Sequence, residues 1–81
     1  MFKATFKSIN ETVKAEGETV LEAFNNLAIK HPKLIVATIR VENGETFIEK
    51  VLSRGVARRF AINPITRGIW AKLLATRFKN G

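Results

Sequence analysis

The chain has 81 residues, of which 46% are hydrophobic and 26% charged, and this composition predicts one globular domain spanning residues 1–81. It contains no cysteine, which excludes disulfides and thiolate metal sites. No apolar run approaches the roughly 20 residues that span a bilayer, and the amino terminus alternates in polarity, so we predict a cytoplasmic protein.

The net charge of +7 is unevenly distributed along the chain. Residues 1–49 carry six basic and seven acidic side chains, a net charge of −1, whereas residues 50–81 carry eight basic side chains and no acidic one, a net charge of +8. Such a segment favours a polyanionic partner, either nucleic acid or an acidic protein surface. Surface charge that serves solubility alone is the alternative.

Two strands and a helix are predicted in the first part of the chain. Residues 2–8 and 11–16 alternate apolar and polar side chains, which is the period of a half-buried strand. After Gly17, Thr19 and Glu22 match a capping box that begins an amphipathic helix. Pro32 ends this helix, because its ring does not fit a helix interior.

A second hairpin is predicted around Asn43-Gly44, a dipeptide that readily adopts the backbone angles of a tight turn. Residues 34–41 form the outgoing strand and residues 46–52 the return strand. Of the outgoing strand, Thr38 and Arg40 are expected on the outer side. The residues expected to face the core are Ile35, Ala37, Ile39 and Val41.

A basic connector from Gly55 onwards is predicted to lead into a last helix over 64–78, with Asn63 as its N-cap and Pro64 in the first turn. The order is then ββαββα, an α+β fold with a single antiparallel sheet and two helices on one face. The apolar face of the last helix is expected to comprise Ile65, Ile69, Trp70, Leu73, Leu74 and Phe78.

Catalytic groups are scarce in this sequence. It has no cysteine, tyrosine or aspartate, and His31 is its single histidine, so neither a catalytic triad nor a histidine metal site is available. The glycines are isolated and do not form a phosphate-binding loop. We therefore predict a binding protein without a cofactor, and not an enzyme.

The candidate binding residues are five cations of the basic segment. Arg54 and Arg58 would project together if the connector forms a helical turn. Arg67 lies near the start of the last helix, where free backbone amides favour an anion. As an alternative, Arg58 or Arg59 pairs with Glu45 or Glu49 on the hairpin. The residues predicted to contact phosphate are Arg54, Arg58, Arg59, Arg67 and Lys72.

The aromatic residues bear on the mode of binding, because proteins that bind single strands stack bases on exposed rings. Phe2, Phe6, Phe24, Phe78 and Trp70 lie in apolar patterns and are expected in the core. Phe60 is the one ring beside arginines, and the position of Phe47 stays open. The outer sheet face is expected to carry no ring, which favours contacts with the backbone of a nucleic acid. Its expected residues are Lys3, Thr5, Lys7, Lys14 and Arg40.

Two resemblances accompany this interpretation. Residues 17–34, with the passage Gly17 to Phe24, resemble the strand-to-helix passage of ubiquitin-like β-grasp sulfur carriers. Those carriers end in a Gly-Gly tail that this chain lacks, so the resemblance implies a ββα beginning and no carrier activity. The capped helix, the Asn-Gly hairpin and the Arg58-Arg59-Phe60 and Thr66-Arg67 passages are similar to small accessory proteins of bacteriophages, which implies action on a host or viral nucleoprotein.

Two hypotheses of function follow from these observations. The first is a small basic accessory protein, encoded by a phage if the resemblance holds, that binds DNA or RNA mainly through phosphate contacts. The second is a protein-interaction or inhibitory module that docks on an acidic protein surface. The choice of nucleic acid and the oligomeric state stay open.

Overall fold

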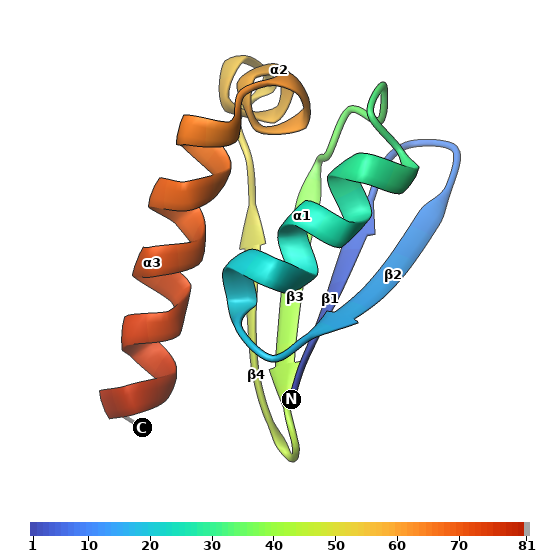
Figure 1. Cartoon of the computed structure of the whole chain (residues 1–81). Coiled ribbons are helices and arrows are strands. Elements are labelled where there is room, and N and C mark those ends of the chain that lie inside the picture. The colour runs from blue at the N-terminus through green and yellow to red at the C-terminus, as the bar shows by residue number, and fades with distance from the viewer. Residues whose placement is uncertain (81) are drawn as a thin grey trace.

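Figure 1 shows the computed structural model, which describes residues 1–80 apart from the side chains at positions 59, 61, 62, 79 and 80. One antiparallel sheet and three helices make up this part of the chain, so the predicted α+β class is confirmed and a short helix is added to the predicted order. The elements are β1 (Phe2–Lys7), β2 (Thr12–Gly17), α1 (Val20–Lys30), β3 (Thr38–Asn43), β4 (Thr46–Val51), α2 (Arg54–Ile62) and α3 (Pro64–Asn80).

The four strands form a sheet in the order β2-β1-β3-β4, in which every neighbouring pair is antiparallel. In this register Ala4 of β1 lies between Ala15 of β2 and Val41 of β3. Because side chains alternate across a strand, this apolar row assigns one side of the sheet to the core and the other to polar residues. The predicted hairpin is present, but its two-residue turn is Gly44-Glu45 and not Asn43-Gly44, because Asn43 pairs with Thr46 as the last residue of β3. Gly44 has a φ of 66°, which glycine adopts without strain, and Asn43 has no positive φ.

Helix α1 begins and packs as predicted. The Thr19 side chain accepts a hydrogen bond from the Glu22 amide at 3.0 Å, which caps the first turn. The helix lies across the core side of the sheet in Figure 1. Its apolar face is buried there, through Val20, Ala23, Phe24 and Leu27.

Helix α3 runs beside α1 on the same side of the sheet, and α2 lies across one end of both (Figure 1). The Asn63 side chain accepts a hydrogen bond from the Ile65 amide at 2.9 Å, so the predicted N-cap is present. The predicted face is only partly right. Ala71 and Leu74 are buried, with Trp70 and Phe78 packed at the edge of the core, whereas three expected core residues are exposed: Ile65, Ile69 and Leu73.

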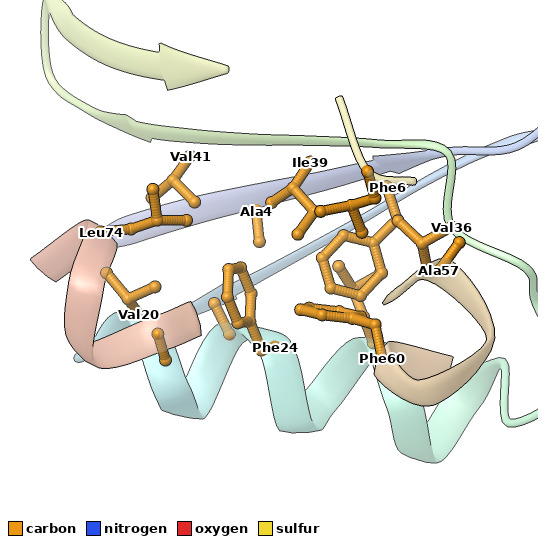
Figure 2. Packing of buried hydrophobic residues seen from close by; sticks show 14 residues of the cluster. Ala4, Phe6, Val20, Phe24, Val36, Ile39, Val41, Ala57, Phe60 and Leu74 are labelled. Carbon is orange, nitrogen blue, oxygen red and sulfur yellow. The ribbon is translucent and has the colours of Figure 1, made fainter. Parts of the chain in front are cut away.

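The centre of the core is a cluster of three rings, one from each of β1, α1 and α2 (Figure 2). The centroid of Phe60 lies 5.0 Å from that of Phe6 and 5.4 Å from that of Phe24, in edge-on contacts that aromatic pairs favour. Phe60 is 0% exposed. Its basic neighbours in the sequence therefore do not make it a surface ring.

The strand β3 begins at Thr38, later than its β-branched sequence predicts. Before it, the Ala37 amide donates to the Lys7 carbonyl, and the Leu52 amide donates to the Ala37 carbonyl, each at 2.8 Å. The segment ahead of these contacts is not a strand, so its side chains do not follow the alternation of β3. Ile35, expected in the core, is 55% exposed, and Val36 is buried in its place.

Candidate nucleic-acid interface

Arg54 and Arg58 lie on the solvent side of α2, one turn apart. The helix forms because the opposite side supplies buried apolar contacts, from Ala57 and Phe60, to the end of the core. Its first turn is closed by a hydrogen bond of 2.8 Å from the Ala57 amide to the Ser53 carbonyl. The helical turn on which the joint projection of the two arginines depends is therefore present.

Arg67 and Lys72 lie on α3 in different surroundings. Arg67 is half-buried, with its Nε atom away from solvent, and the Asn63 side chain occupies the cap of the helix start. Both features reduce the access of an outside anion to this turn. Lys72 is exposed and lines a shallow groove between α3 and the amino end of α1, beside Thr19. The side chain of Arg59 lies outside the described residues.

The structure places the basic residues at two separate points. Arg54 lines a cavity together with His31, which follows the carboxyl end of α1, whereas Lys72 lies beside Thr19 at the amino end. The 11 residues of α1 correspond to roughly 16 Å of helix. The cations therefore do not converge on one phosphate-sized pocket, and the pair on α2 stands apart from Lys72.

Carboxylates pair with two cations of the outer face of the sheet, Lys7 and Arg40. The carboxylate of Glu49 lies 3.5 Å from Lys7 Nζ and 4.0 Å from an Arg40 nitrogen, and Glu42 accepts a hydrogen bond of 2.9 Å from Arg40 Nε. The alternative in which Arg58 pairs with Glu49 is therefore not what the structure shows. Among the described residues, Arg54, Arg58 and Lys72 form no ion pair.

Phe47 lies on the outer face of the sheet, opposite Glu42 in the β3–β4 register. Its ring is half exposed, and the Arg40 guanidinium carbon lies 4.1 Å from the ring centroid. This cation–π contact covers one face of the ring. The expectation of an outer face without a ring is therefore wrong, since Phe47, whose position the sequence left open, lies there. Its alternate-residue pattern with Glu49 and Val51 was the available signal.

Arg77 is an exposed cation that is not among the phosphate contacts predicted from the sequence. It follows Ile69 and Leu73 at steps of four residues, so the three share one side of α3. Its position at the far end of α3 extends the basic surface beyond Lys72. The spacing was visible in the sequence, but the apolar side of α3 was assigned to the core.

Comparisons of this chain with protein-family models, curated proteins and solved structures found no match. No helix in the described residues combines the length and the apolar character needed to cross a membrane. Within the same residues, no group of three or more histidine or carboxylate side chains is placed to hold a metal ion.

Proposed function

We propose that the protein binds nucleic acid through phosphate contacts made by Arg54, Arg58 and Lys72, with Arg59 as a further contact and Arg67, which is half-buried, in a minor role. The observation that supports this proposal is the division of charge. The ion pairs of Lys7, His31 and Arg40 all involve the sheet or its loops, and no acidic residue follows Glu49 in the sequence. The exposed cations of α2 and α3 keep their charge available for a polyanion.

The spacing of these cations suits a polymer better than a single anion. Two contact points near opposite ends of α1, a helix of roughly 16 Å, can each meet a phosphate of the same backbone, because the phosphates recur along the strand. Three of the seven rings are buried and three more are packed against the core, which argues against base stacking as the main mode. We therefore propose weakly sequence-specific binding to the backbone. In this proposal the protein is an accessory factor of the cytoplasm and not an enzyme, and its resemblance to small bacteriophage proteins favours a phage origin.

Labelled DNA and RNA strands of about 20 nucleotides, measured by fluorescence anisotropy, test this proposal. Binding is expected near 50 mM salt and should weaken steeply towards about 200 mM, because each phosphate contact releases counterions. Absence of binding to single-stranded DNA, duplex DNA and RNA at the lower salt concentration would overturn the proposal.

Charge-matched variants locate the interface. The double variant Arg54→Gln, Arg58→Gln should bind at least about tenfold more weakly and lower the slope of log affinity against log salt by about two. The control Lys3→Gln, Lys14→Gln removes the same charge from exposed positions on the outer sheet face. Equal losses in the two double variants would mean that net charge alone, and not the α2 surface, drives binding.

A second function, docking on an acidic protein, is favoured by the exposed apolar side of α3. Ile65, Ile69 and Leu73 lie in one row beside Arg77, a combination of apolar and basic contacts that is common in protein interfaces. This function predicts a stoichiometric partner that survives nuclease treatment of the lysate and is lost in the Ile69→Ser variant. The nucleic-acid proposal predicts that such a partner disappears with the nucleic acid.

A further inference from the structure

A cavity of about 700 Å³ lies at the end of the molecule where α1 terminates. The β1–β2 turn, the loop between α1 and β3, and the start of α2 form its walls. Small-molecule sites in proteins have volumes of about 300–1,000 Å³, so this cavity has the size of a ligand site. It opens beside Arg54 and away from the groove that Lys72 lines.

The walls of this cavity are largely apolar. Ile9 is 97% exposed at the tip of the β1–β2 turn, and Ile35 is more than half exposed in the loop before β3. Leu34, Leu52 and Ala57 line the inner part. Branched side chains that surround a cavity in this way gain contacts when an apolar group enters it and displaces water.

Positive charge predominates at the cavity. Lys33 and Arg54 outnumber the one carboxylate that lines it, that of Glu11, which lies 3.9 Å from His31 Nδ1. Among the described residues, Lys33 and Arg54 have no carboxylate partner. An entering group with a negative charge would therefore be attracted, and a cation would be repelled.

We propose that this cavity binds a small amphiphilic carboxylate. The apolar body lies against Ile9, Leu34 and Ile35, and the carboxylate faces Lys33 and Arg54. This site shares Arg54 with the nucleic-acid interface, but Lys33 and the apolar walls are not among the proposed phosphate contacts, so the two sites can be tested separately.

Three probes separate the two halves of the proposed ligand. Decanoate carries both the chain and the charge, decanol only the chain, and acetate only the charge. Decanoate is expected to bind with a Kd of about 1 mM or tighter, with amide shifts in the NMR spectrum confined to the cavity walls. Decanol should bind more weakly and acetate not detectably. Equal binding of decanoate and decanol, or shifts scattered over the surface, would overturn the proposal.

Two variants with matched controls test the walls. Lys33→Gln should weaken decanoate binding about fivefold and leave decanol binding unchanged, whereas the control Lys30→Gln removes a neighbouring exposed charge outside the cavity. Ile9→Ser should weaken binding of both probes, and the control Ile29→Ser removes an exposed isoleucine outside the cavity. If each variant behaves like its control, the cavity is not the site. Nucleic-acid affinity measured on the same proteins separates this outcome from failure of the proposed function.

Discussion

Gly17 and Gly68 occupy opposite kinds of position. A methyl group built at Gly17, where β2 ends, would lie 2.5 Å from the Ala23 backbone nitrogen and 2.9 Å from the Glu22 Cβ. The absence of a side chain thus allows the first turn of α1 to approach the strand closely. A methyl group at Gly68, within α3, would meet nothing within 4 Å. No close contact requires glycine at position 68, and glycine there weakens α3 because its helix propensity is low.

These two glycines should respond to alanine with opposite signs. We expect Gly17→Ala to lower the free energy of unfolding by about 1–3 kcal/mol, because the first turn of α1 must shift. Gly68→Ala should raise it by about 0.5–1 kcal/mol, through better helix propensity. Urea unfolding followed by circular dichroism measures both changes. A neutral Gly17→Ala variant would contradict the close approach of β2 and α1.

At the scale of the elements, local signals predicted those parts whose cause is local. The Thr19 cap and the β3–β4 turn depend on neighbours in the sequence, and both are present, the turn one residue later than predicted. Helix α2 has no such cause, since it forms where Phe60 reaches the rings of Phe6 and Phe24, far away in the sequence. The three arginines and the glycine of α2 are, in the sequence alone, typical of a connector between a strand and a helix.

The inner side of α3 was not predictable from periodicity. The large apolar residues of α3 are spread over a wide part of its circumference, so the sequence does not single out one buried side. The structure buries Ala71 and partly buries Ala75, and small residues at these positions allow α3 to lie close to α1. The branched residues Ile69 and Leu73 are left outside as a result.

The role of α2 in the core can be tested by its one ring. Phe60→Ala should lower the free energy of unfolding by about 3–5 kcal/mol, because it removes the ring between Phe6 and Phe24. Phe47→Ala, on the exposed outer face, should cost less than about 1 kcal/mol. Chemical denaturation of both variants gives the comparison. Where Phe60→Ala does not fold, Phe60→Leu supplies the measurement, and a loss no larger than that of Phe47→Ala would contradict the core position of Phe60.

For the whole molecule, the sequence predicted where positive charge is concentrated but not how it is arranged. The excess over 50–81 was evident from composition, whereas the pairing of Glu49 with Lys7 depends on the register of the three strands β1, β3 and β4. Distance also depends on the fold, since α1 separates Arg54 from Lys72. The candidate cations could therefore be predicted from the sequence. Their division between α2, with Arg54 and Arg58, and α3, with Lys72, could not.

This arrangement predicts different effects of charge removal on thermal stability. The Arg54→Gln, Arg58→Gln variant should have a Tm equal to or slightly above that of the unaltered protein at low salt, because it relieves repulsion in a chain of net charge +7. Lys7→Gln should be less stable by at most about 1 kcal/mol, since its ion pair with Glu49 is exposed. Calorimetry at low and high salt should show both differences shrinking. A Tm lowered by several degrees in the α2 variant would mark its arginines as structural.

The strand order carries a consequence for synthesis on the ribosome. Strand β1 is made first but lies inside the sheet, between β2 and β3. Once the β1–β2 hairpin has emerged, the other edge of β1 stays unpaired until residues 38–43 have followed. During that interval the edge can pair with the same strand of a neighbouring nascent chain. We therefore expect slower translation between α1 and β3 to lower the fraction of protein that reaches the native state.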